Sequence, residues 1–156
     1  MPPPPAPHPL LNPRVLRDPR PQELAPLDEQ CFSPSWSLQD YGQLLSSPAV
    51  SAWILTGDKG GWGFLCWQQV REEAELYRIG IVPAHRGQGL GLWAMQYWQT
   101  DLRTRGVRRV VLEVRAGNAP AIALYERAGY SPLAIRKAYY HDPREDALSF
   151  ELRLSP

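Results

Sequence analysis

Apolar residues in the middle of the chain come in short runs that end at glycines or charged residues, a spacing typical of β-strands. This pattern predicts strands over residues 50–55, 62–70 and 75–82. The segment Gly57-Asp58-Lys59-Gly60-Gly61 has the composition of a tight turn, so the first two of these strands are expected to form a hairpin. A shorter strand is predicted earlier in the chain, over residues 14–17.

Helical spacing follows the third of these strands. Between residues 89 and 105 the apolar residues recur at a spacing that places them on one side of a helix, at Leu90, Trp93, Tyr97, Trp98 and Leu102. Gly106 is the expected end of this helix. Three shorter helices are predicted over residues 23–32, 37–45 and 118–128. Ser37 and Asn118 are the expected N-caps of the last two, and Gly129 ends the last one.

The remaining chain predicts further strands. Residues 109–114 alternate between two faces, with Glu113 and Arg115 on the same face. Residues 130–139 and 147–154 are expected to form a final hairpin. Because strands and helices mix without a regular β-α-β alternation, the fold class is α/β of the α+β kind, with one largely antiparallel sheet and helices on its faces.

Composition separates the first residues from the rest. The 156 residues include 17 prolines, and the chain opens with Met1-Pro2-Pro3-Pro4-Pro5-Ala6-Pro7-His8-Pro9. Proline fixes φ and lacks a backbone donor, so this stretch disfavours both helix and strand. We interpret residues 1–11 as a flexible, solvated leader and residues 12–156 as one domain. The alternative is that the leader is a docking motif for a partner that binds proline-rich segments.

Charge and cysteine content exclude several classes of protein. The formal net charge of +1 argues against a broad nucleic-acid-binding surface and a polybasic membrane anchor. The two cysteines and three scattered histidines predict neither a disulfide scaffold nor a structural zinc site. No apolar run is long enough to span a membrane, and no signal-peptide core is present. We expect a cytoplasmic protein without a metal, direct nucleic-acid contact or membrane contact.

The segment His85-Arg86-Gly87-Gln88-Gly89-Leu90-Gly91 lies between a predicted strand and a predicted helix. Glycines at alternate positions let backbone N–H groups turn inward around an oxyanion. The following helix adds its unpaired amides and the positive end of its dipole. This arrangement favours a pyrophosphate-binding loop. A tight turn without a ligand is the alternative, although a single glycine would be enough for that.

Two other phosphate-binding motifs fit less well. Gly89-x-Gly91-x-x-Ala94 matches part of the dinucleotide-binding fingerprint, with Glu113 near the position of a ribose contact. The fingerprint should follow its strand directly, however, and should open a long run of βα units, for which too little chain remains. The P-loop is excluded because no Lys-Ser or Lys-Thr follows the glycines.

Arg86-x-x-Gly89-x-Gly91 after a strand resembles the acetyl-CoA pyrophosphate loop of the GNAT superfamily of N-acetyltransferases. Further segments are similar to the subgroup that acetylates the N-terminal alanine of a small-subunit ribosomal protein, namely residues 112–126, 129–130, 136–140 and 145–147. The resemblance covers about residues 76–152. This subgroup usually has serine before Asn118, where this chain has Gly117, which leaves one polar contact in question.

The resemblance implies a mixed, mostly antiparallel sheet in which the parallel strands 75–82 and 109–114 splay apart. It also implies acetyl-CoA as cosubstrate. Its pantetheine arm would run along backbone groups of Ile79, Gly80 and Ile81. Its pyrophosphate would be held by Arg86, Gly87, Gln88, Gly89, Leu90, Gly91 and Leu92. The side chain of Asn118 is placed near the pantetheine in addition to capping its helix.

The resemblance assigns Glu113 as general base and Tyr125 as general acid. From the residues alone, Glu113 could instead pair with Arg115, and Tyr125 could be a core tyrosine. The resemblance also implies that the acceptor is selected by Trp36, Arg136, Tyr139 and Tyr140. Ordinary hairpin packing is the alternative for the tyrosine pair.

The expected function is acetyl transfer from acetyl-CoA to the N-terminal α-amine of a protein. The acceptor that the resemblance implies is the N-terminal alanine of a small-subunit ribosomal protein. Acetylation of lysine or of a small-molecule amine is the second hypothesis. A non-catalytic acyl-CoA-binding module is the third, and the presence of both Glu113 and Tyr125 argues against it.

Overall fold

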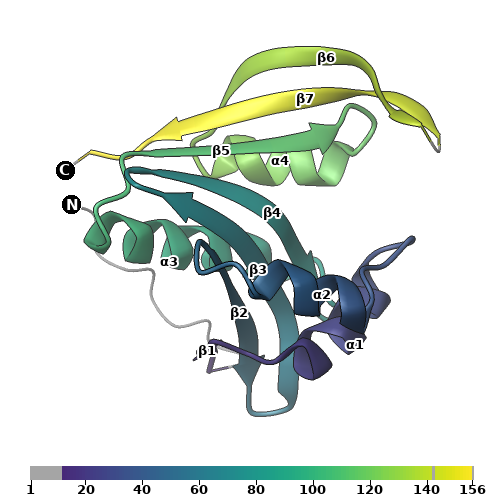
Figure 1. Ribbon diagram of the computed structural model, residues 1–156, viewed down its shortest axis with the longest axis vertical. Coiled ribbons are helices and arrows are strands. Elements are labelled where there is room, and N and C mark those ends of the chain that lie inside the picture. The colour runs from purple at the N-terminus through teal and green to yellow at the C-terminus, as the bar shows by residue number, and fades with distance from the viewer. Residues whose placement is uncertain (1–11, 142, 156) are drawn as a thin grey trace.

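The computed structural model describes residues 12–141 and 143–155, so the leader predicted over residues 1–11 lies outside the described residues. Seven strands form one sheet in this part of the chain (Figure 1). They are β1 (Arg14–Arg17), β2 (Val50–Gly57), β3 (Gly60–Val70), β4 (Glu73–Ile81), β5 (Arg109–Arg115), β6 (Ser131–His141) and β7 (Arg144–Arg153). The strand order is β1-β2-β3-β4-β5-β7-β6, and among these pairs β4 and β5 alone run parallel.

Helices cover both faces of the sheet. The first two, α1 (Pro21–Cys31) and α2 (Leu38–Leu45), lie on one face, over β2 to β4. The opposite face carries α3 (Leu90–Thr104) and α4 (Ala119–Arg127), with α4 beneath β5 to β7 (Figure 1). A short 3-10 helix, η1 (Pro83–His85), leads from the end of β4 into the glycine loop. The face of β5 to β7 that points away from α4 carries no helix of the described chain (Figure 1).

The predicted fold class is confirmed, because the sheet is mostly antiparallel, contains one parallel pair and carries helices. Ser37 and Asn118 cap α2 and α4 through their own side-chain oxygens, as predicted. α1 begins earlier than predicted, at Pro21, because the fixed φ of proline suits the first helical turn. β6 runs on to His141 and β7 starts at Arg144, since an edge hairpin can pair its backbone while polar side chains face solvent.

An aromatic cluster fixes α3 on the sheet. Trp53 of β2 packs edge-to-face against Trp67 of β3, with ring centroids 5.3 Å apart. Trp67 packs in the same way against Trp98 of α3 at 5.6 Å, and all three side chains are buried. Each aromatic pair contributes about 0.5–1.5 kcal/mol beyond the burial of its area. This cluster therefore holds α3, whose first turn carries the end of the glycine loop, in a defined place on the sheet.

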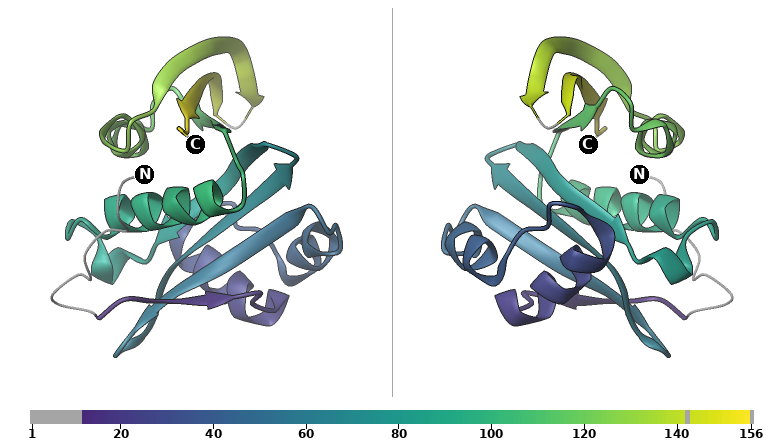
Figure 2. Two further views of the ribbon diagram at one scale, coloured as in Figure 1. Left: turned by 90° about the vertical axis from the view of Figure 1, so that its left-hand side faces the viewer. Right: turned by 90° about the vertical axis from the view of Figure 1, so that its right-hand side faces the viewer.

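The parallel strands separate after a short stretch of pairing. β4 and β5 are in register over Glu73–Leu76 and Arg109–Leu112, and pairing stops there. At the same point the register of β4 against β3 slips between Cys66 and Trp67, which leaves Tyr77 without a partner on β3. A bulge of this kind bends its strand and increases the local twist. Figure 2 shows the sheet in two halves, β1 to β4 in one and β5 to β7 in the other.

Gly63→Ala should destabilise the fold by forcing β3 and β4 apart. A Cβ atom at Gly63 would lie 2.7 Å from the carbonyl oxygen of Gly80 on β4. We expect the free energy of unfolding to fall by roughly 1–3 kcal/mol, measured by urea titration. Gly42→Ala on α2 is the matched control, because nothing lies within 4 Å of its Cβ position. That change should stabilise the helix by about 0.5–1 kcal/mol, and equal values for the two variants would contradict the prediction.

Candidate active site

A cleft of about 850 Å³ opens where β4 and β5 part, and both halves of the sheet contribute to its walls. The predicted site residues that line it are Trp36, Ile79, Gly80, Ile81, Arg86, Gly87, Gly89, Leu90, Gly91, Glu113, Asn118, Tyr125 and Tyr140. The other predicted site residues, which are absent from this lining, are Gln88, Leu92, Arg136 and Tyr139. Tertiary structure thus brings most of the predicted residues to one cavity.

One wall of the cleft is the far end of β4. Ile79–Ile81 pair with β3 on one side, whereas on the other side the pairing with β5 has already ended. An unpaired strand edge presents backbone N–H and C=O groups that an extended ligand can bind. Arg86 reaches back to this strand, and its Nε donates a hydrogen bond of 2.8 Å to the Ile81 carbonyl oxygen. The glycine loop is therefore anchored to the same strand whose edge faces the cleft.

The glycine loop has the backbone conformation that the sequence predicts for an anion site. Gly87 and Gly89 adopt φ values of +78° and +76°, a left-handed region that favours glycine. Gly89 stands at the N-cap of α3 and supplies no side-chain cap, so the amides of the first helical turn have no side-chain partner there. Gly91 lets α3 approach α4, because a Cβ atom would lie 3.3 Å from Leu124. The loop places backbone donors and a helix N-terminus beside the cleft.

Glu113 projects from β5 into the cleft. Burial alternates along β5, so Glu113 lies on the face opposite the buried Leu112 and Val114. Its Oε1 atom is 3.3 Å from an Nη atom of Arg136 on β6. The Oε2 atom is buried, with no hydrogen-bond partner among the described residues. The ion pair thus leaves one carboxylate oxygen available for a further interaction inside the cleft.

Tyr125 is both a packed residue and a cleft residue. Its side chain, on α4, is 8% exposed and lines the cleft. Its ring packs against Tyr130 with centroids 6.0 Å apart. Burial, with a smaller contribution from Tyr140, raises the pKa of Tyr125 to about 12. The phenol is therefore protonated at neutral pH and can donate a hydrogen bond. Tyr125 is therefore buried as a core residue would be, and it also lies on the wall of the cleft.

Asn118 likewise has two structural roles, as the N-cap of α4 and as a residue of the cleft wall. Its Oδ1 atom accepts a hydrogen bond of 3.3 Å from the Ala121 amide and so caps α4, while the residue lines the cleft. The neighbouring Gly117 amide donates to Oε2 of Glu145 at 2.7 Å. A Cβ atom at Gly117 would lie 2.7 Å from the same oxygen. Glycine at position 117 therefore allows this close approach of Glu145, and Asn118 still caps α4.

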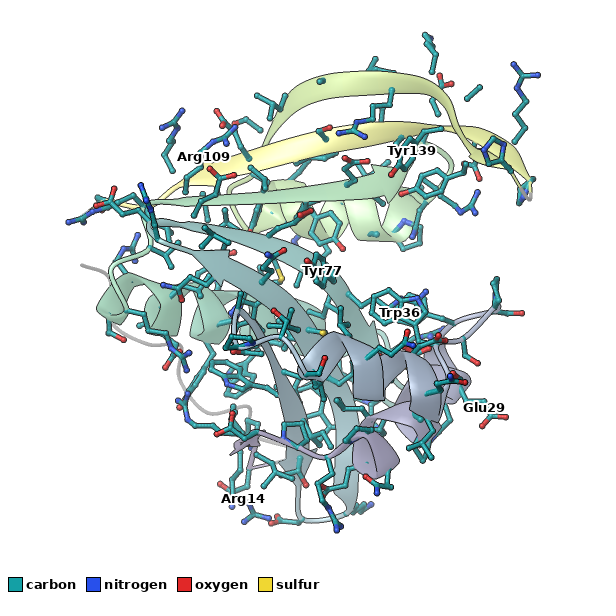
Figure 3. All side chains as sticks on the ribbon, viewed as in Figure 1. Arg14, Glu29, Trp36, Tyr77, Arg109 and Tyr139 are labelled. Atoms are coloured by element: carbon teal, nitrogen blue, oxygen red, sulfur yellow. The ribbon has the colours of Figure 1, made fainter. Side chains whose placement is uncertain are left out.

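The hairpin of β6 and β7 closes the end of the cleft near Glu113. The ring of Tyr140 lies under the guanidinium of Arg115, at 4.1 Å from Cζ to the ring centroid. Burial first, and the charge of Glu113 second, raise the pKa of Tyr140, which Arg115 partly opposes. Tyr139 packs edge-to-face on Tyr140 with centroids 5.3 Å apart and is exposed. In Figure 3, Tyr139 lies above the opening between the two halves of the sheet, with Trp36 and Tyr77 below it.

Some cleft residues were not singled out by the sequence as site residues, among them Tyr77, Arg78, His85 and Arg115. Arg115 could have been found, because it shares a strand face with Glu113; its side chain pairs with Glu145 at 3.5 Å. Arg78 could not have been found from neighbouring residues, because its partner Asp28 is 50 positions away in the chain. Within residues 12–141 and 143–155, no group of three or more His, Cys, Asp or Glu side chains could hold a metal ion. The helices described are all too short or too polar to cross a membrane.

Residues 21–130 match the acetyltransferase (GNAT) family. This match covers well over half of the chain, so the protein belongs to that family.

Two individual similarities are more specific. The chain is 44% identical over 94 residues to the [ribosomal protein bS18]-alanine N-acetyltransferase of Escherichia coli, a match that covers 59% of this chain and 64% of that relative. The crystal structure of the ribosomal-protein-S18-alanine N-acetyltransferase from Escherichia coli superposes with a TM-score of 0.84 at 30% identity, over 92% of this chain and 95% of that one. A GNAT acetyltransferase from Elizabethkingia anophelis with acetyl-CoA bound shares the fold, with a TM-score of 0.75 at 16% identity over 91% of this chain and 98% of that one.

Because the pKa of Tyr125 is raised in the folded protein, the free energy of unfolding should depend on pH in the alkaline range. Its folded pKa of about 12 exceeds the unfolded value of about 10. The neutral phenol therefore stabilises the fold fully below about pH 10, and this contribution is lost as pH rises towards about 12. Relative to Tyr125→Phe, the wild-type free energy of unfolding should fall by about 1.4 kcal/mol between about pH 9 and about pH 11. A difference between the two proteins that stays constant in urea titrations would show that Tyr125 titrates normally.

Proposed function

We propose that this protein transfers an acetyl group from acetyl-CoA to the N-terminal α-amine of a protein, and that the acceptor is the N-terminal alanine of ribosomal protein bS18. The observation that carries this proposal is the convergence of the open β4 edge, the glycine loop, Glu113 and Tyr125 on one cleft. Membership of the acetyltransferase family supports the reaction. The name of the Escherichia coli relative supports the acceptor.

The described residues fit acetyl-CoA as cosubstrate. Backbone groups of Ile79, Gly80 and Ile81 would pair with the pantetheine amides as a neighbouring strand does. Amides from Gly87 to Leu92, together with Arg86, would hold the pyrophosphate at the N-terminus of α3. Asn118, at the start of α4, lines the same cleft. Because backbone amides and a helix dipole hold the phosphates, a net charge of only +1 is compatible with this anionic ligand.

Glu113 acts as the base in this proposal. An α-amine with pKa near ~8 needs about 1 kcal/mol for deprotonation at neutral pH, whereas a lysine near ~10.4 needs about 4 kcal/mol. One carboxylate, directly or through a water molecule, is enough for the smaller demand. Arg136 holds Oε1 of Glu113 at 3.3 Å, which orients the carboxylate and leaves Oε2 towards the acceptor. The smaller free-energy cost of deprotonation favours an N-terminal amine over a lysine side chain.

Tyr125 stabilises the leaving group in this proposal. When bound, acetyl-CoA supplies a thioester whose carbonyl carbon bonds to the amine nitrogen while its C–S bond breaks. Glu113 takes the proton that leaves the nitrogen, and Tyr125 donates a hydrogen bond to the departing thiolate. From a pKa of about 12, full proton transfer to a thiolate whose conjugate acid is near ~8.5 is uphill by about 5 kcal/mol. We therefore assign Tyr125 mainly the hydrogen bond, with any protonation of the sulfur coming late.

The acceptor would enter between the aromatic residues at the hairpin end of the cleft. Trp36 and Tyr140 line this end. Tyr139 and Arg136 flank it through their contacts with Tyr140 and Glu113. The acceptor backbone would lie against these rings, with its amine towards Glu113.

The reaction and its acceptor class can be tested with peptides that carry a free alanine, serine or methionine N-terminus or a blocked one, half of them with an internal lysine. We expect acetyl-CoA-dependent acetylation of the free α-amine, located by mass spectrometry, with alanine-first peptides the best substrates. Acetylation confined to lysine would contradict the proposed acceptor. Tight binding of acetyl-CoA without turnover would instead indicate a binding module.

Glu113→Gln should separate catalysis from cofactor binding. The amide keeps the shape of the side chain but cannot accept the amine proton, so we expect kcat to fall by about 10²-fold or more. The Kd for acetyl-CoA, measured by calorimetry, should stay close to the wild-type value. Glu29→Gln, an exposed residue on α1, removes the same charge outside the cleft and should leave both values unchanged. Loss of acetyl-CoA binding in Glu113→Gln would mean that Glu113 is structural.

A further inference from the structure

A fully buried carboxylate lies behind the acceptor end of the cleft. Asp28 of α1 is 0% exposed. Its Oδ1 atom accepts a hydrogen bond of 2.9 Å from the Trp36 amide, and Oδ2 accepts one from the buried Tyr41 hydroxyl. Nη1 of Arg78 lies 2.9 Å from Oδ1 and 3.0 Å from Oδ2. Burying a charge is costly unless it is paired and hydrogen-bonded, and Asp28 meets both conditions through residues from three different segments.

The guanidinium of Arg78 lies between two aromatic rings. Its Cζ atom is 3.9 Å from the ring centroid of Trp36 and 4.3 Å from that of Phe32. The Arg78 side chain is 17% exposed, and all three residues line the cleft. A planar guanidinium can stack on aromatic faces while its edge donates to a carboxylate, which a lysine ammonium cannot do. Arg78 therefore joins the two rings to Asp28 in one rigid stack.

This stack is the connection between two walls of the cleft. Residues 32–37 form the loop between α1 and α2. Two of its residues are tied to Asp28: the Phe32 amide donates to the Asp28 carbonyl oxygen at 2.9 Å, and the Trp36 amide donates to the Asp28 side chain. Arg78 belongs to β4, just beyond the bulge at Tyr77 and next to Ile79. The loop is thus held against the strand whose edge would bind the cosubstrate.

We propose that Arg78 is a positioning residue for the acceptor: through its ion pair with Asp28 it holds the rings of Phe32 and Trp36 as the acceptor wall, at a fixed distance from the cofactor-binding edge of β4. This inference rests on the proposed function and adds the determinant of acceptor binding to it. A buried ion pair is weak evidence for stability, since apolar replacements are often as stable. Here the ion pair connects the two aromatic rings to β4, so its role is to fix the position of the rings relative to that strand.

The test compares Arg78→Lys with Arg109→Lys. Lysine keeps the charge beside Asp28 but loses the planar stack, so we expect the KM for the acceptor peptide to rise about tenfold. We expect kcat to change by less than about threefold and the Kd for acetyl-CoA by less than about twofold. Arg109 is the matched control: it is ion-paired with Glu151 at 2.7 Å, its side chain is 26% exposed, and it lies outside the cleft lining. Its lysine variant should keep all three values.

Three outcomes would overturn the inference. The acceptor KM could stay unchanged in Arg78→Lys, the acetyl-CoA Kd could rise together with that KM, or Arg109→Lys could show the same change in KM. A second readout does not need turnover. Hydrogen exchange at the Trp36 amide should accelerate in Arg78→Lys relative to wild type, and unchanged exchange would show that Arg78 does not hold the loop. Absence of turnover in the wild type would overturn the proposed function, while the exchange result would still decide the role of Arg78.

Discussion

Backbone hydrogen bonds between β4 and β5 end at Leu76 and Leu112, and the site depends on where they end. Had the pairing continued, the edge of Ile79–Ile81 would be occupied by β5 and no cleft would exist. The bulge at Tyr77 coincides with this point, and a bulge bends its strand, so β4 bends where its pairing with β5 ends. One interruption in the ladder therefore creates the exposed strand edge and the space in front of Glu113, and it separates the two halves of the molecule.

Three arginines beside the cleft pair with carboxylates, whereas Arg86 bonds to a backbone carbonyl oxygen. Arg78 pairs with Asp28, and Arg136 pairs with Glu113. Arg115 pairs with Glu145 and also stacks on the ring of Tyr140. Under the proposed function, binding of a phosphorylated cosubstrate would fall to Arg86, the backbone amides of the glycine loop and the dipole of α3. Such a division of roles would make a net charge of +1 compatible with the proposed anionic cosubstrate.

Residues at the cleft also serve the fold, which limits what can be substituted there. Asn118 caps α4 and lines the cleft, and Tyr125 packs in the core while reaching the same cavity. Glu145 explains the glycine at position 117, because a Cβ atom there would lie only 2.7 Å from its Oε2 atom. Glycine at this position therefore allows contact with the β6–β7 hairpin, and Asn118 still caps α4.

Local patterns in the sequence determined the elements and much of the site. Alternation along β5 placed Glu113 and Arg115 on one face, and caps and glycines marked the helix ends. The glycine loop predicted a site for an anion. Each of these features depends on neighbours within a few residues. Tertiary structure alone decided that Glu113 pairs with Arg136 and that Arg78 reaches Asp28. It also decided where β4 leaves β5. These features depend on packing between segments far apart in the chain, and spacing along the sequence carries no record of which distant side chain will fill a given contact.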